Sequence, residues 1–183
     1  IITSYPDGIN SSDVIQVKSG EDVEIPNSEL IDIGVDKQWV DGEKAGSTID
    51  VELYWSYNKS TSKMPSDAQL ATAEELGIMY GGFSANKTVN SGKNQKVWED
   101  LPNGKDSKPI YYYIKETAYT IDNMKYTLVT DKEKENYGKY VTENGNVGEY
   151  FPTYVGNATN SDSVITVNNS QKLILKKVWK NAS

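Results

Sequence analysis

Three polar residues stand at strand positions that should carry core side chains, and the first is a lysine. Lys37 shares one face of its strand with Val35 and Trp39, because side chains alternate across a strand. Burial disfavours the charged form of a lysine, so Lys37 needs a partner or must lose its proton. Its chemistry is therefore that of a paired ammonium or of a neutral amine.

The other two residues are a carboxylic acid and an amide. Glu116 continues the apolar face of Ile114 in the run PIYYYIKET, and Asn169 continues that of Val167 in the run SVITVNNS. Burial raises the pKa of a carboxyl group for the same reason that it lowers the pKa of a lysine. The sequence thus predicts that Lys37, Glu116 and Asn169 are all buried.

The elements that must position these residues are strands. Apolar and polar residues alternate in several runs that are bounded by polar turns, as is typical of an all-β domain. The predicted strands cover residues 31–39, 48–57, 87–91, 95–101, 109–117, 126–130 and 163–170.

One helix is predicted as an insertion into this β domain, over residues 66–80. Ser66 would cap it, and Gln69 would complete a capping box. The charged run DKEKEN at 131–136 predicts a solvated hairpin tip. It does not fit a calcium loop, because Asn136 stands where the sixth position needs glycine.

The composition excludes several classes of site and partner. A formal net charge of -7 argues against nucleic acid, whose phosphates need a basic patch. The chain has no His and no Cys, so it offers no Ser-His-Asp or Cys-His nucleophile, no imidazole or thiolate metal site and no disulfide. We expect no metal, no cofactor and no enzymatic turnover of an external substrate.

The length of 183 residues suits one core of ordinary domain size. We expect residues 1–30 to be the tail of a preceding unit or an N-terminal hairpin. Residues 31–172 should form the main domain, and residues 173–183 should start a following repeat unit.

The expected repeat rests on a second copy of the lysine pattern. Lys177 and Trp179 repeat the spacing of Lys37 and Trp39, which suggests a tandem array. The sequence shows no signal peptide and no long apolar run, so we expect a piece of a longer polypeptide without membrane insertion.

Three motifs resemble the signatures of Cna B-type domains, which occur in the surface adhesins and pilins of Gram-positive bacteria. VDKQWVDG opens the main domain, YYYIKET lies in its middle and TVNNS closes it. The resemblance covers roughly residues 31–172 and implies an Ig-like β-sandwich or a partly open barrel. The run ETAYTIDNM departs from the family's pattern, because it lacks the proline and glycine that usually follow the glutamate.

The resemblance also implies a reaction. In such domains the lysine of the first strand joins the asparagine of the last strand through an intramolecular isopeptide bond, assisted by a glutamate. Matched by motif, these residues are Lys37, Asn169 and Glu116. Lys177 would be the lysine of the next unit, and we expect it to be unlinked because its acceptor would lie downstream.

The residue types suit this reaction on chemical grounds. An amine attacks an amide only in its neutral form, and burial favours a neutral Lys37 and a protonated Glu116. A protonated Glu116 can polarise the Asn169 carbonyl and move protons so that ammonia leaves. Each molecule would react once, without turnover. The alternative is a buried salt bridge between Lys37 and Glu116, with Asn169 as an ordinary hydrogen-bonded edge residue.

Two functions from different classes follow. The first is a structural stalk or repeat module of an adhesin or pilin: extracellular, anchored to the cell wall through a segment outside this fragment, and flanked by neighbouring domains of the same polypeptide. The second is an adhesive module that binds a host glycan or a matrix protein through a Tyr-, Asn- and Gly-rich loop. That loop, residues 137–163, contains Tyr140, Tyr150, Phe151 and Tyr154, and it could equally be a surface loop that packs on its own domain.

Overall fold

The computed structural model describes residues 29–92 and 94–171 of the chain. The expectations for residues 1–28 and 173–183 lie outside the described residues. The unlinked Lys177 of a following unit falls in that second range and is therefore also outside them.

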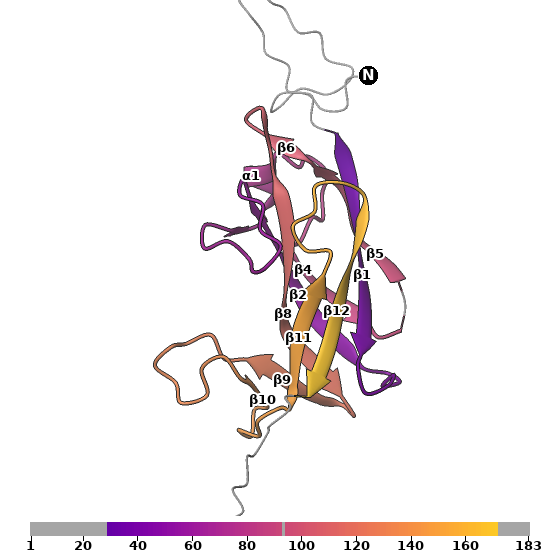
Figure 1. The fold of residues 1–183 in the computed structure, drawn as a ribbon, viewed down its shortest axis with the longest axis vertical. Helices are drawn as coiled ribbons and strands as arrows, with labels where there is room; N and C mark the ends of the chain where they lie inside the picture. Colours follow the sequence, from indigo (N-terminus) through magenta and orange to yellow (C-terminus); the bar gives the residue numbers. More distant parts are fainter. Residues whose placement is uncertain (1–28, 93, 172–183) are drawn as a thin grey trace, which may run out of the picture.

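The fold is an all-β sandwich in which two curled sheets form a half-barrel, as the sequence predicts (Figure 1). The first sheet has the strand order β11-β12-β1-β5, and the second has the order β10-β9-β8-β2-β3, with β4 also paired to β2. The strands are β1 Leu30–Trp39, β2 Thr48–Ser56, β3 Gln69–Leu70, β4 Asn86–Asn90, β5 Asn94–Pro102, β6 Gly104–Lys105, β7 Lys108–Pro109, β8 Tyr111–Ile121, β9 Met124–Leu128, β10 Tyr140–Val141, β11 Tyr150–Val155 and β12 Ser163–Gln171.

The core lies between the two sheets and is built from alternating positions. In β2 every second residue is buried, from Ile49 through Val51 and Leu53 to Trp55, which confirms the predicted inward face. β1 and β12 show the same alternation. Each strand thus directs one row of side chains into the core and the other toward solvent.

The first and last described strands are parallel neighbours. β1 pairs with β12 in a register that places Lys37 opposite Val167 and Trp39 opposite Asn169. β5 flanks β1 on the other side, and β11 flanks β12, both antiparallel. Because β1 and β12 run in the same direction, β1 starts at one end of the domain and β12 finishes at the other (Figure 1).

The predicted helix over residues 66–80 is wrong in its extent. Residues Gln69–Leu70 form β3, and the helix α1 covers only Ala73–Leu76. Its N-cap is Thr72, whose hydroxyl oxygen accepts the Glu75 amide at 3.2 Å, so the N-cap lies six residues after the one predicted at Ser66. Pairing with β2 overrides the helical propensity of this stretch, since the Ala71 amide donates to the Leu53 carbonyl at 2.9 Å.

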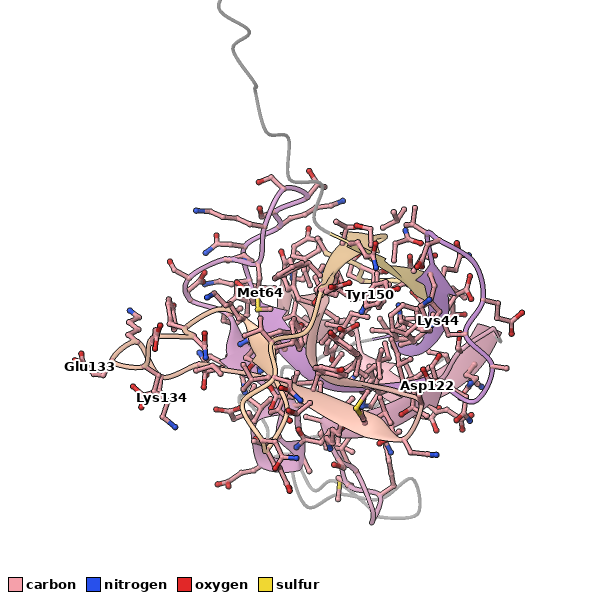
Figure 2. All side chains as sticks on the ribbon, turned by 90° about the horizontal axis from the view of Figure 1, so that it is seen from below. Lys44, Met64, Asp122, Glu133, Lys134 and Tyr150 are labelled. Atoms are coloured by element: carbon pink, nitrogen blue, oxygen red, sulfur yellow. The ribbon has the colours of Figure 1, made fainter. Side chains whose placement is uncertain are left out.

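Residues 137–163 do not form the long loop that the sequence predicts. They contain β10 and β11, and β11 pairs with β12 along its whole length. The charged run 131–136 does lie in an exposed turn between β9 and β10, as predicted. Figure 2 shows Glu133 and Lys134 at the outer end of this turn, away from the rest of the domain.

The segment between β11 and β12 closes part of the gap between the sheets. Tyr112 of β8 exchanges backbone hydrogen bonds with Thr159, at 2.7 and 3.2 Å. The side-chain amide of Asn157 then takes the place of a strand: its Oδ1 accepts the Ile114 amide at 3.0 Å and its Nδ2 donates to the Ile114 carbonyl at 3.3 Å. This segment therefore joins β8 of one sheet to the β11-β12 hairpin of the other.

Candidate functional site

Lys37, Glu116 and Asn169 are each 0% exposed. Lys37 comes from β1 and Asn169 from the neighbouring β12, while Glu116 comes from β8 of the opposite sheet. The alternation of each strand turns these side chains into the core, as predicted. The structure thus brings the lysine, the carboxyl group and the amide into one apolar interior.

The amino group of Lys37 lies between two carbonyls and an aromatic ring. Its Nζ donates to the Gln38 carbonyl at 2.6 Å and to the Val167 carbonyl at 3.4 Å. The same nitrogen lies 3.9 Å from the centre of a Trp39 ring. Lys37 and Glu116, both in the described part of the chain, form no direct ion pair, which argues against the simple buried salt bridge.

Glu116 and Asn169 are in direct contact. Asn169 Nδ2 donates to Glu116 Oε1 at 2.9 Å. Glu116 Oε2 and Asn169 Oδ1 are buried without a hydrogen-bond partner among the described residues. A half-turn of the amide would present its oxygen to a protonated Glu116, so the same contact can serve either protonation state of the acid.

Burial shifts both titratable groups toward their neutral forms. It lowers the pKa of Lys37 to about 8, although the charges of Glu116 and Asp41 oppose the change. It raises the pKa of Glu116 to about 7, against the hydrogen bond from Asn169, the charge of Lys37 and a contact with Tyr140. A neutral amine and a protonated acid are thus both accessible near neutral pH.

Trp39 covers the amino group and is itself held from several sides. Its indole N–H contacts the hydroxyls of Ser47 at 2.9 Å and Ser91 at 3.1 Å. Its ring meets the rings of Tyr119 and Tyr150 edge to face, with centroids 6.0 and 5.0 Å apart. This packing fixes the indole over Lys37 and keeps water away from the amine.

A polar network lies at the outer side of Trp39. The Tyr150 hydroxyl donates to Asp41 at 2.6 Å, and Lys44 forms an ion pair with the same carboxylate at 3.2 Å. Figure 2 shows Lys44 and Tyr150 near one another on the same side of the domain. These contacts tie the turn after β1 to β11 beside the buried site.

Comparison with protein-family models, with curated proteins and with solved structures finds no match for this chain. Within residues 29–92 and 94–171, no group of three or more His, Cys, Asp or Glu could hold a metal ion. The same ranges contain no helix that is long and apolar enough to cross a membrane.

The four aromatic residues expected in a ligand-binding loop do not lie in a loop. Tyr140 is in β10 and only 2% exposed, while Tyr150, Phe151 and Tyr154 are in β11 and partly buried. Tyr150 and Tyr154 pack against the core. Their predicted placement in a loop is therefore wrong, because all four residues lie in β10 and β11.

Two features near Glu116 were not predicted. β8 has a bulge at Thr117, since Glu116 is opposite Val51 while Ala118 is opposite Asp50. A bulge inserts one residue and reverses which side chains point inward. The signal in the sequence was Tyr119, an aromatic residue three positions after Glu116 that strict alternation would have turned outward.

The second unpredicted feature is a pair of tyrosine hydroxyls on the Glu116 backbone. The Glu116 amide donates to the Tyr154 hydroxyl at 2.8 Å, and the Tyr140 hydroxyl donates to the Glu116 carbonyl at 3.0 Å. Both tyrosines are more than twenty residues from Glu116, so local patterning could not reveal these contacts.

Proposed function

We propose that this chain is a structural stalk module whose first and last strands become joined by an isopeptide bond between Lys37 and Asn169, with Glu116 as the proton shuttle. The observation that carries the proposal is the contact between the Asn169 amide and the Glu116 carboxyl at 2.9 Å, inside the core that also holds Lys37. Lys37 and Glu116 are fully buried, which is rare for these residue types unless they are paired.

The strand register supports a direct reaction between the two ends of the bond. Lys37 is opposite Val167, and Asn169 follows two residues later on the same face of β12. A diagonal neighbour on an adjacent strand is within reach of a long side chain. Because the fold holds the Lys37 amine and the Asn169 amide in the same core, their reaction does not depend on a diffusional encounter.

The reaction balances without any outside reagent. The neutral amine of Lys37 attacks the side-chain carbonyl carbon of Asn169, while the protonated Glu116 donates a hydrogen bond to the carbonyl oxygen. Glu116 takes one proton from the attacking nitrogen and gives one to the departing amide nitrogen. The new C–N bond replaces the old one, ammonia leaves, and Glu116 ends in the form in which it began.

The resemblance of the three motifs supports a place for this module in a Cna B-type array. In the proposed setting the domain is part of an adhesin or pilin, outside the cell, with its own neighbouring domains as partners and a cell-wall anchor elsewhere. The direction of β1 and β12 suits this role, because the chain enters at one end of the domain and leaves at the other (Figure 1).

The proposed bond would cross-link a chain that has no cysteine and therefore no disulfide. It encloses the 131 residues from 38 to 168 in a covalent loop. By analogy with a disulfide that closes a loop of this size, it should stabilise the fold by about 4–5 kcal/mol through the unfolded state. An adhesive role is not favoured, because the tyrosines that suggested it are engaged within the domain.

Intact-mass spectrometry tests the proposal. We expect a mass one ammonia below that calculated from the sequence, and the full calculated mass in Lys37→Ala and in Asn169→Ala. Asn168→Ala is the matched control, because Asn168 neighbours Asn169 on the opposite face of β12 and should leave the ammonia loss intact. A wild-type mass equal to the calculated value would overturn the proposal.

A further inference from the structure

We propose that the hydroxyls of Tyr140 and Tyr154 are positioning groups that hold the backbone of Glu116 in place for the cross-linking reaction. This inference rests on the proposed function. It gives a role to two tyrosines that the sequence had suggested as ligand contacts, and it adds two residues to the lysine, acid and amide of the site.

The backbone of Glu116 lies where the regular strand pairing of β8 is interrupted. On one side the bulge at Thr117 breaks the register with β2. On the other side the pairing with β9 runs from Ala118 to Ile121 and stops before Glu116. A peptide at such a gap needs other partners for its N–H and C=O groups, since buried backbone groups are almost always hydrogen-bonded.

Tyr154 supplies the partner for the Glu116 amide, at 2.8 Å. Its place in the sheet links it to the rest of the site, because Tyr154 is opposite Val167 in β12 and Val167 is opposite Lys37 in β1. Lys37 and the group that holds Glu116 therefore lie on one row across three strands. A shift of β11 would move the acid relative to the amine.

Tyr140 supplies the partner for the Glu116 carbonyl, at 3.0 Å. The phenol is 2% exposed and its ring packs against Tyr119 and Phe151, so its hydroxyl has a fixed direction. Burial and the nearby carboxyl group raise the pKa of Tyr140 above its usual value, which keeps the hydroxyl a donor. The two phenols thus hold both sides of one residue's backbone.

Such positioning matters because the acid must reach both the attacking and the leaving nitrogen. Displacement of a catalytic group by about 1 Å can slow a reaction by roughly a hundredfold, even when every reacting group is present. Loss of one hydroxyl removes a single atom and leaves the aromatic ring in its packing. The expected effect is therefore on the rate of cross-linking more than on folding.

The test measures cross-linking and folding separately in Tyr154→Phe and Tyr140→Phe. Each chain is assembled by chemical synthesis and ligation in denaturant, so that it cannot react before dilution starts folding, which is followed by tryptophan fluorescence. Ammonia loss is followed by intact mass in the same samples. The matched control is Tyr112→Phe, because the Tyr112 hydroxyl donates to the Pro102 carbonyl at 2.7 Å on the same strand as Glu116 but outside the site.

We expect Tyr154→Phe and Tyr140→Phe to fold and to lose ammonia at least about tenfold more slowly than wild type. Tyr112→Phe should react at the wild-type rate. Cross-linking of both site variants at the wild-type rate would overturn the inference while leaving the proposed function intact. Equal slowing in Tyr112→Phe would overturn it too, since any buried hydroxyl would then have the same effect. No ammonia loss in wild type would overturn the proposed function itself.

Discussion

Burial and charge have opposite effects on the protonation states of Glu116 and Lys37. Each is driven toward its neutral form by burial, and each would favour the charged form of the other. In the absence of a direct ion pair between Lys37 and Glu116, neither charge is well compensated. An amide bond removes the amine from this balance and leaves one acid that can stay protonated.

Glu116→Gln separates the role of Glu116 in proton transfer from its role in packing. The amide side chain has nearly the same shape but cannot shuttle protons, so we expect the variant to fold with Lys37 and Asn169 unjoined. Its melting temperature should fall by about 10 °C or more if several kcal/mol of stabilisation are lost in a domain of this size. Mass spectrometry and thermal unfolding measure the two effects.

The control for this variant is Asp36→Asn, which changes the carboxylate nearest to Lys37 in sequence. Asp36 is on the other face of β1, where it accepts a hydrogen bond from Gln38 at 2.7 Å, so the control should cross-link normally. Full ammonia loss in Glu116→Gln at the wild-type rate would remove Glu116 from the mechanism.

The stability of an uncross-linked variant should have a minimum between about pH 7 and pH 8. In Asn169→Ala, folded Glu116 keeps its proton to about pH 7 or above, because the variant lacks the Asn169 hydrogen bond that lowers this pKa. The unfolded group loses its proton near pH 4.5, so stability falls as the pH rises above that value. Folded Lys37 loses its proton near pH 8, while the unfolded group keeps it to about 10.5, so stability rises again above pH 8. Urea unfolding at a series of pH values measures this.

Other carboxylates and lysines also titrate, so the comparison needs a variant without the buried pair. Asn169→Ala combined with Lys37→Met and Glu116→Gln removes both groups and keeps their approximate volumes. The unfolding free energy of Asn169→Ala minus that of the triple variant, plotted against pH, should show the minimum between about pH 7 and pH 8. A flat difference across this pH range would show that neither group is shifted in the folded state.

At the scale of elements, the seven strands β1, β2, β4, β5, β8, β9 and β12 could be predicted from the sequence, whereas β3, β6, β7, β10 and β11 could not. β1, β2, β8 and β12 can be predicted because each strand buries one face, so apolar and polar residues alternate along it. The same alternation placed Lys37, Glu116 and Asn169 in the core. Which strands are neighbours, and that β1 and β12 are parallel, depends on contacts that local patterning does not encode.

The wrong predictions also arise from contacts between strands that are distant in the sequence. Residues 66–80 contain good helix formers, but pairing with β2 holds Gln69–Leu70 in a strand and leaves room for one helical turn. β10 and β11 were missed because they are short or partly exposed and are interrupted by Pro152 and polar residues. The hydroxyl contacts of Glu116 depend on these missed strands and could not be predicted without them.

Gly148 is a position where the connection from β10 to β11 has no room for a side chain. A Cβ atom there would lie 1.9 Å from the Tyr119 hydroxyl and 2.9 Å from the Tyr126 ring. We expect Gly148→Ala to destabilise the domain by about 1–3 kcal/mol, as is typical of overpacking. Denaturant unfolding in a Lys37→Ala background measures the change without the proposed isopeptide bond.

Gly81→Ala provides the control for this substitution. A Cβ atom at Gly81 would meet nothing within 4 Å, so its effect should be small. Equal stability of the two variants would mean that Tyr119 moves aside without cost. Tyr119 would then not be a fixed wall behind Trp39.

At the scale of the whole molecule, the two parallel strands define a path for force. Tension applied at the start of β1 and at the end of β12 pulls these neighbours in opposite directions. If the proposed bond forms, the load passes along β1 to Lys37, crosses to Asn169 and leaves through the last residues of β12. The rest of the sandwich lies outside this path.

Single-molecule stretching between the two ends of the chain tests this path. Lys37→Ala should unfold and release the chain between the two cross-link positions. In wild type, residues 38–168 should stay enclosed by the proposed bond. Unfolding of wild type should therefore release these 131 residues fewer than unfolding of Lys37→Ala, a difference of roughly 45 nm of extended chain. Equal extension in both proteins would mean that the bond is absent or does not carry the load.

The parallel pairing of β1 and β12 also has a consequence for protein synthesis. Lys37 and Val167 are separated by 130 positions, so at ordinary elongation rates β1 waits roughly 6–26 s for its neighbour to be made. A chain that stops before Ser163 lacks both the strand that covers this side of β1 and the amide that Lys37 would attack. Under the proposed reaction, the loss of ammonia therefore marks a copy that was translated through β12, and truncated copies keep an open strand edge by which they can aggregate.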